Sequence, residues 1–192
     1  MDDIAILKEL LKHNATISLE DSIYDGNKKF INLIEHDLSA DGYSITVNGM
    51  PNDTEVIVIK ADEFKSPDSV FAGLKGECKR ADFIIIINNG IKKVIIYIEM
   101  KAKKTTSSEA EIIKQLYGAK CFLSYCREIG KTFWNKNDFL KNYSERYVTL
   151  RNISMSKRQT RTKPNTGIHD RPEKMLKISS PKYLHLNNLI GC

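Results

Sequence analysis

The sequence predicts an α/β fold with a central mixed β-sheet flanked by helices. Two β-branched runs, 81–87 and 93–101, surround Asn88-Asn89-Gly90, a pattern that is typical of an antiparallel hairpin. A stretch with helical periodicity, 108–129, follows this hairpin directly. A chain in which strands lie between helices builds one sheet as its core, and 192 residues suffice for one such domain.

The first elements are predicted from the spacing of apolar residues. Residues 2–13 have an apolar helical face and two acids at the N-terminal end, and so predict a helix. Residues 27–38 predict a second helix, whose apolar stripe consists of Phe30, Ile31, Ile34 and Leu38. Two short strands are expected over 43–48 and 54–60, followed by a mixed loop.

The middle of the chain has the clearest pattern. Ile84 to Ile87 are four consecutive isoleucines, which is typical of a central strand covered on both faces. Ser108 and Glu111 have the spacing of a capping box and predict that a helix begins here. We expect that helix to run to about Ile129, before Gly130.

The C-terminal part is less regular. A strand is expected over 147–153, and a long loop over 156–174, where no apolar periodicity is present. A last short strand is expected at 175–178, and 183–190 is consistent with either a short strand or a short helix.

Charge is distributed unevenly along the chain. Residues 1–99 contain 11 Lys/Arg and 17 Asp/Glu, whereas residues 100–192 contain 19 and 7. Such asymmetry is typical of a surface that binds polyanions, usually nucleic acid, although a solvated lysine-rich surface has the same composition. We expect one domain over 1–192, with its core at about 27–153 and a basic segment at about 154–192.

Composition disfavours several classes of protein. No apolar run reaches about 18 residues, so we expect no transmembrane helix and no membrane partner. The acidic start, Met1-Asp2-Asp3, lacks the order of a signal peptide, and a cytoplasmic protein is the simplest expectation. The four cysteines and four histidines show no zinc-ligand spacing.

Three polar residues of the hairpin form a candidate catalytic group. Glu99 and Lys101 share one face of the second strand, because side chains alternate along a strand. With Asn89-Gly90 as a two-residue turn, Asp82 faces Tyr97, and Glu99 is its diagonal neighbour at roughly 7–8 Å. A slip of one residue would place Asp82 on the opposite face, so this prediction depends on register.

The chemistry of this group suits a hard divalent cation. Carboxylate oxygens without histidine or thiol ligands favour Mg²⁺ or Mn²⁺. Such an ion neutralises the charge of a phosphate and lowers the pKa of a bound water, and an adjacent lysine stabilises developing negative charge. Asp82 and Glu99 are therefore candidate metal ligands, and Lys101 is a candidate catalytic residue for phosphodiester hydrolysis.

The order Asp82, then Glu99-x-Lys101, on a hairpin between two helices resembles the PD-(D/E)xK nuclease superfamily, which has the restriction-endonuclease-like fold. The resemblance covers about residues 27–153. It implies an α/β core with a central mixed sheet and Mg²⁺ held by the Asp and the Glu. Arg80-Ala81-Asp82 departs from the family's Pro-Asp, so order and spacing are the basis of the resemblance.

The resemblance also implies roles for residues outside the hairpin. Glu35, on the expected helix before the first strand, matches a helical acid that completes the metal site in many members; a solvent-facing charge is the alternative. Gln115, on the helix after the hairpin, matches a glutamine that contacts the site; an ordinary boundary residue is the alternative. The charge distribution, and not the resemblance, gives candidate contacts to the nucleic-acid backbone: Lys103, Lys104, Arg158, Arg161, Lys163 and Arg171. For Lys103 and Lys104 a solvated charge run is the alternative.

These observations together predict a Mg²⁺-dependent endonuclease that acts on nucleic acid, DNA rather than RNA, of the restriction or defence type. A ribonuclease on the same fold and a non-catalytic basic nucleic-acid-binding module are the alternatives. Restriction-like folds often cut duplexes as dimers, so a homodimer is also implied by the resemblance. Sequence specificity and protein partners are not predicted.

Overall fold

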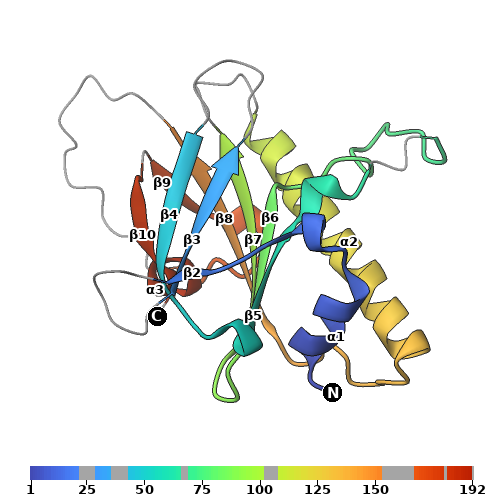
Figure 1. The fold of residues 1–192 in the computed structure, drawn as a ribbon. Coiled ribbons are helices and arrows are strands. Elements are labelled where there is room, and N and C mark those ends of the chain that lie inside the picture. The colour runs from blue at the N-terminus through green and yellow to red at the C-terminus, as the bar shows by residue number, and fades with distance from the viewer. Residues whose placement is uncertain are drawn as a thin grey trace.

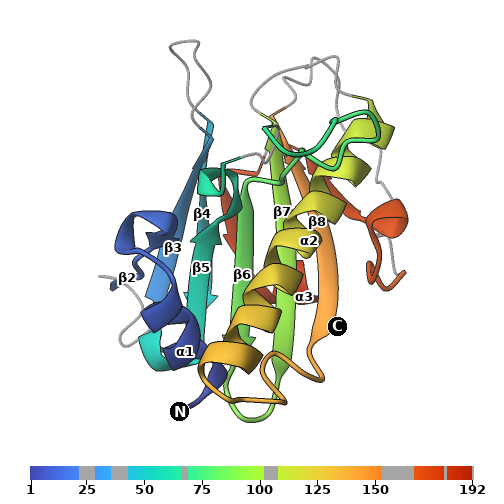
Figure 2. The ribbon, with the colours of Figure 1, turned by 90° about the vertical axis from the view of Figure 1, so that its right-hand side faces the viewer.

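The computed structural model of the chain describes residues 1–21, 29–35, 43–65, 69–101, 108–152, 167–179 and 181–191. These residues form two β-sheets and three α-helices (Figures 1 and 2). The α/β class with a mixed sheet is therefore confirmed. Within the described part of the chain, no helix combines the length and the apolar character that crossing a membrane requires.

The larger sheet has six strands in the order β1-β5-β6-β7-β8-β9. Their bounds are β1 Thr16–Ile17, β5 Val56–Lys60, β6 Phe83–Asn88, β7 Lys93–Lys101, β8 Ser144–Arg151 and β9 Leu176–Ser179. The pairs from β1 to β7 are antiparallel, whereas β7, β8 and β9 run parallel. This is a mixed sheet, as the sequence predicts.

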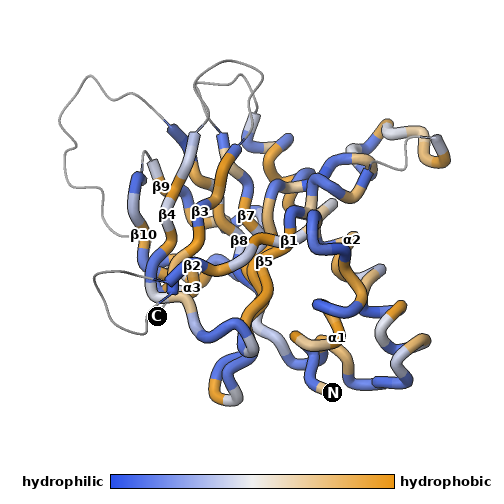
Figure 3. Tube along the Cα trace, viewed as in Figure 1, coloured by the Kyte–Doolittle hydropathy of each residue, from blue (hydrophilic) through white to orange (hydrophobic). Residues whose placement is uncertain are grey.

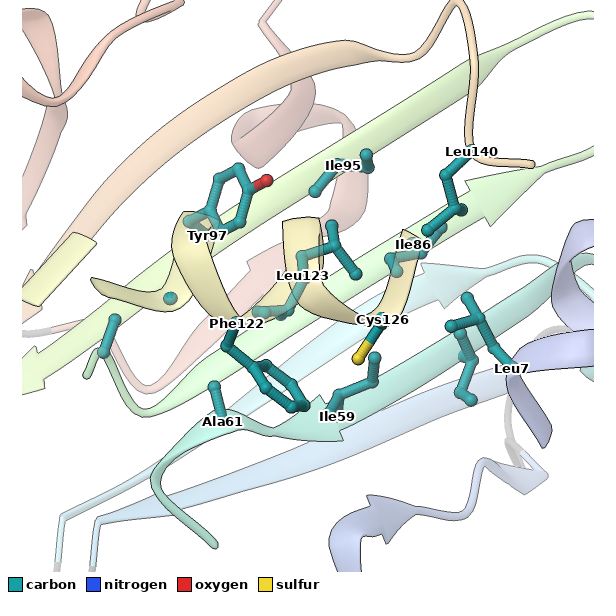
Figure 4. Close-up of a cluster of buried hydrophobic side chains, with 14 of the residues drawn as sticks. Leu7, Ile59, Ala61, Ile86, Ile95, Tyr97, Phe122, Leu123, Cys126 and Leu140 are labelled. Carbon is teal, nitrogen blue, oxygen red and sulfur yellow. The ribbon is translucent and has the colours of Figure 1, made fainter. Parts of the chain in front are cut away.

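Helices cover one face of this sheet. They are α1 (Asp3–Leu10) and α2 (Glu109–Phe133), whose apolar side chains meet Ile59, Ile86 and Ile95 in one hydrophobic core (Figure 4). The predicted cap is present, since the Ser108 side chain accepts a hydrogen bond from the Glu111 backbone N–H at 3.2 Å.

Helix α2 continues past Gly130, where the sequence suggested that it ends. A Cβ at this position would lie 2.1 Å from the Phe139 ring. The glycine therefore allows the close approach of Phe139 to the helix and does not terminate it.

A second sheet covers the other face. Its order is β10-β4-β3-β2, with bounds β2 Glu20–Asp21, β3 Lys29–Glu35, β4 Tyr43–Met50 and β10 Tyr183–His185. Together with the short helix α3 (Leu186–Ile190), it encloses a second hydrophobic core against the six-stranded sheet. Hydrophobic residues run along the strands of both sheets, and hydrophilic residues lie in loops and near strand ends (Figure 3).

The predicted helix at 27–38 is wrong, because residues 29–35 form β3. Ile31 and Leu33 alternate with more exposed neighbours and are fully buried, and β3 pairs with β4 along its whole length. The sheet is therefore flanked by helices on one face and by a second sheet with α3 on the other.

Candidate active site

The hairpin β6–β7 brings Asp82 and Glu99 together in a register that differs from the predicted one. Asn88 pairs with Lys93, and Phe83 pairs with Ile98, so the connecting loop has four residues, Asn89 to Lys92. The Asn89 side chain holds this loop by accepting hydrogen bonds from the backbone N–H groups of Ile91 (3.2 Å) and Lys92 (2.7 Å). The predicted two-residue turn is therefore wrong.

The difference between the two registers is two residues, which leaves every side chain on its predicted face. Tyr97 now pairs with Ile84, and the last pair of the ladder is Phe83 with Ile98. Asp82 lies in a bend directly before β6, and the same register continued by one residue would set it opposite Glu99. Ile84 and Tyr97 belong to the core beneath α2, so Asp82 and Glu99 continue that face toward the end of the sheet. The Met100 N–H bonds to Asp82 and the Asp82 charge acts on Glu99, so the two acids lie close together.

The three candidate residues are held in place by specific contacts. The Asp82 carboxylate accepts a hydrogen bond from the Met100 backbone N–H at 2.5 Å. Lys101 forms an ion pair with Oε1 of Glu99, whose side chain is fully buried, while the Lys101 side chain is 14% exposed. The second oxygen of Glu99, Oε2, is also buried and receives no hydrogen bond from any described residue.

Burial and neighbouring acidic charges raise the pKa values of both Asp82 and Glu99. Burial raises the pKa of Asp82 to about 7, opposed by the Met100 N–H and by the charge of Lys101. Burial, and then the charge of Asp82, raise the pKa of Glu99 well above its ordinary range, and Lys101 offsets only part of this. Burial lowers the pKa of Lys101, but the nearby carboxylates, Glu99 first, outweigh it and leave that pKa raised. The site therefore disfavours the charged forms of both acids despite the neighbouring Lys101.

Two strands add polar residues to this end of the sheet that the sequence analysis did not identify. In the parallel register, Glu99 pairs with Thr149 of β8, and Thr149 pairs with Lys177 of β9. Glu99, Thr149 and Lys177 thus form one row across β7, β8 and β9. Together with Asp82, which directly precedes β6, we call them the polar row. The Thr149 hydroxyl is fully buried, and within the described part of the chain no residue forms a hydrogen bond with it.

The polar row is closed by α2 and extended by Arg151. Lys177 forms an ion pair of 2.5 Å with Glu109, the first residue of α2, and so ties β9 to that helix. Arg151 pairs with Lys101 in the β7–β8 register, two residues beyond the Glu99–Thr149 pair toward the end of the strands. Only the parallel pairing of β7, β8 and β9 could have revealed these neighbours, because nothing local in the sequence indicates it.

Glu35 lies at the end of β3 and not on a helix. Its charge contributes to the raised pKa values of Asp82, Glu99 and Lys101, so it acts on the same end of the sheet. Among the residues that the structure describes, however, no three His, Cys, Asp or Glu side chains are grouped closely enough to hold a metal ion. Coordination by Glu35 together with Asp82 and Glu99 stays a prediction.

The structure describes Gln115 and Arg171 but not the other candidate contacts to nucleic acid. Gln115 is half-buried on the second turn of α2, beside the core residue Leu116, and its role stays a prediction. Arg171 is exposed and lies 3.5 Å from the carboxylate of Asp170. Lys103 and Lys104, and likewise Arg158, Arg161 and Lys163, lie outside the described residues.

Comparison with protein-family models, curated proteins and solved structures finds no match to this chain. The function of the chain is therefore inferred from the geometry of the polar row and from the residue pattern.

Proposed function

We propose that the chain is a divalent-cation-dependent endonuclease of the restriction or defence type that hydrolyses phosphodiester bonds, in DNA rather than RNA. The observation that carries this proposal is the meeting of Asp82 and Glu99 at the end of β7, where Asp82 bonds to the Met100 N–H and Lys101 is ion-paired to Glu99. The order β4, β5, β6, β7, α2, β8 supports it, because it matches the strands and the following helix that the resemblance to the PD-(D/E)xK superfamily implies; the helix implied before the first strand is instead the strand β3.

The donor set suits a hard cation such as Mg²⁺ or Mn²⁺. Asp82 and Glu99 offer carboxylate oxygens, and the buried Oε2 of Glu99 lacks a hydrogen-bond donor among the described residues. When bound, such an ion neutralises the charge of the scissile phosphate and lowers the pKa of a coordinated water. It would also stabilise both carboxylates in their charged forms, which burial in the free protein disfavours.

The protein's own groups have separate tasks in this proposal. The Met100 N–H orients the Asp82 carboxylate. Glu99 holds the Lys101 ammonium at the end of β7, where it stabilises the negative charge that develops on the phosphate. A positioned charge acts strongly here because the surroundings of Glu99 exclude water.

The test is cleavage of supercoiled plasmid DNA and of structured RNA, with Mg²⁺ or Mn²⁺ and with EDTA. We expect cation-dependent nicking of DNA, which Glu99→Gln abolishes and Lys101→Ala slows by about 100-fold or more. The matched control is Lys29→Ala, which also removes a lysine from an ion pair with acids, Asp21 and Asp53, but lies on the second sheet. It should cleave at the wild-type rate.

Each alternative has its own outcome in this assay. Cleavage of RNA alone would identify a ribonuclease. Binding without cleavage under all cation conditions would identify a non-catalytic module. A Lys101→Ala variant that cleaves as fast as the wild type would refute the assignment of this residue.

A further inference from the structure

The end of the six-stranded sheet opposite the polar row has two adjoining hollows. One is lined by residues of the last turns of α2 and of the loop that precedes β8. The other is lined by the β6–β7 loop, the start of β8 and the C-terminal residues Ile190 and Gly191. Asn142 lines both hollows, which adjoin at this end of the sheet. The first lies on the α2 side of the sheet, with Glu145, and the second on the α3 side, with Arg146 and Ile190; together we call them the groove. Both figures of the ribbon show the β6–β7 loop and the end of α2 at this same end of the molecule (Figures 1 and 2).

This groove is strongly basic. Six of its lining residues are cationic: Lys92, Lys93, Arg127, Lys131, Lys141 and Arg146. We call these six residues the basic groove. One acid, Glu145, also lines it, and this carboxylate already binds Lys120 at 2.7 Å and the Tyr147 hydroxyl at 2.7 Å. The groove therefore attracts anions, and its lining is too poor in free carboxylates to bind a metal ion.

Part of this positive charge is held in fixed positions. The Arg146 guanidinium donates hydrogen bonds to the backbone carbonyl oxygens of Ile190 (2.6 Å) and Glu145 (2.8 Å). Lys93 lies over the ring of Tyr143, with 5.6 Å between its ammonium and the ring centre. Arg127 has a buried Nε that forms no hydrogen bond with any described residue. Arg146 and Lys93 are therefore held in place before a ligand arrives, which lowers the entropy lost on binding.

The groove is separate from the polar row. Lys93 and Lys101 are the first and last residues of β7, and eight steps at roughly 3.3 Å each separate them by about 26 Å. An anion in the groove is therefore beyond direct contact with Asp82 or Glu99. It is also more than two Debye lengths away at physiological salt, where one length is about 8 Å.

We propose that the basic groove binds the phosphate backbone of a nucleic acid, at a surface distinct from the polar row. Six cations spread over two adjoining hollows match a repeating chain of phosphates better than one compact anion. Backbone contacts of this kind position a nucleic acid without reading its sequence. The choice of nucleic acid rests on the proposed nuclease function, whereas the binding itself requires no cleavage.

The test measures binding of a fluorescent duplex of about 20 base pairs by anisotropy, in EDTA, with the full chain. Lys92→Glu/Lys141→Glu removes two exposed groove cations. The matched control is Lys12→Glu/Lys182→Glu, which changes the net charge equally at exposed lysines that line neither hollow. Circular dichroism melting checks that both variants fold.

We expect the groove variant to weaken binding by about 10- to 100-fold and to reduce the slope of log K against log salt by about 2, one per lost phosphate contact. The control should change affinity by less than about threefold. Equal weakening in both variants would overturn the inference, since net charge alone would then explain it. Competition by a mononucleotide or inorganic phosphate as strong as that of an unlabelled duplex would also overturn it, in favour of a small-anion pocket.

The same experiment separates the two proposals. If the wild type binds and cleaves DNA but the groove variant binds as tightly as the wild type, the inference fails and the proposed function stands. If binding depends on the groove while no cleavage occurs with any cation, the proposed function fails and the inference stands. If the wild type binds neither the duplex nor structured RNA, both fail.

Discussion

Replacing Asp82 by Asn should stabilise the folded protein at neutral and alkaline pH. The substitution removes the charge, and the Asn side-chain oxygen can still accept the Met100 N–H. Burial raises the pKa of Asp82 from 3.8 to about 7 in the folded state, so the folded protein disfavours the charged form. Below the unfolded-state pKa the carboxyl is protonated in both states. As the pH rises from the unfolded-state pKa to the folded-state pKa, the carboxyl ionises in the unfolded chain first, and this favours unfolding. The wild type should therefore lose stability from about pH 4 to about pH 7.

The size of the effect follows from the two pKa values. The difference between 3.8 and about 7 corresponds to about 4 kcal/mol of unfolding free energy. Asp82 is partly exposed and titrates together with Glu99, so solvent screening and coupling reduce the amount observed for one residue. We expect the difference in unfolding free energy between Asp82→Asn and the wild type to grow by about 2 kcal/mol or more from about pH 4.5 to about pH 8, in favour of the variant.

The assay is urea unfolding of both proteins in EDTA across this pH range. Glu128→Gln is the control, because Glu128 lies on the exposed side of α2 with a side chain that is 68% exposed. Its stability relative to the wild type should stay nearly constant. A difference between Asp82→Asn and the wild type that does not change with pH would refute the reasoning that burial penalises the Asp82 charge.

Three further predictions concern the cation, the helix and the buried hydroxyl. Millimolar Mg²⁺ at about pH 8 should raise the melting temperature of the wild type by about 3–5 °C but not that of Glu99→Gln; equal shifts would exclude Glu99 as a ligand. Gly118→Ala should lower the unfolding free energy by about 1–3 kcal/mol, because the new Cβ would lie 1.8 Å from the Lys79 carbonyl oxygen; the usual helix-stabilising gain would contradict this contact. Thr149→Val should raise the unfolding free energy by about 1 kcal/mol, since it removes an unsatisfied buried hydroxyl; a loss measured by urea unfolding would mean that the hydroxyl has a partner.

The sequence alone was sufficient to predict the hairpin strands, the start of α2 and the shared face of Asp82, Glu99 and Lys101. These features depend on local signals: β-branched runs, a capping box and the two-residue period of a strand. The shared face survived an incorrect turn, because the register changed by an even number of residues. A local pattern therefore predicted the face correctly while the exact cross-strand partner was wrong.

Tertiary pairing decided the features that local signals leave open. The spacing of Phe30, Ile31 and Ile34 fits a helix, yet pairing with β4 makes these residues a strand and moves Glu35 to a strand end. Propensity is a weak preference, and partners in the fold override it.

The polar row and the basic groove also required the folded structure. Thr149 and Lys177 become neighbours of Glu99 only through the parallel register of β7, β8 and β9. The basic groove joins residues of the β6–β7 loop, of α2 and of the C-terminus that are far apart in the chain. The sequence by itself determined which residues could do chemistry and on which face of a strand each lies, because alternation is local. Which of them meet across the sheet was decided by long-range pairing, because contacts between distant segments form only when the whole core is buried.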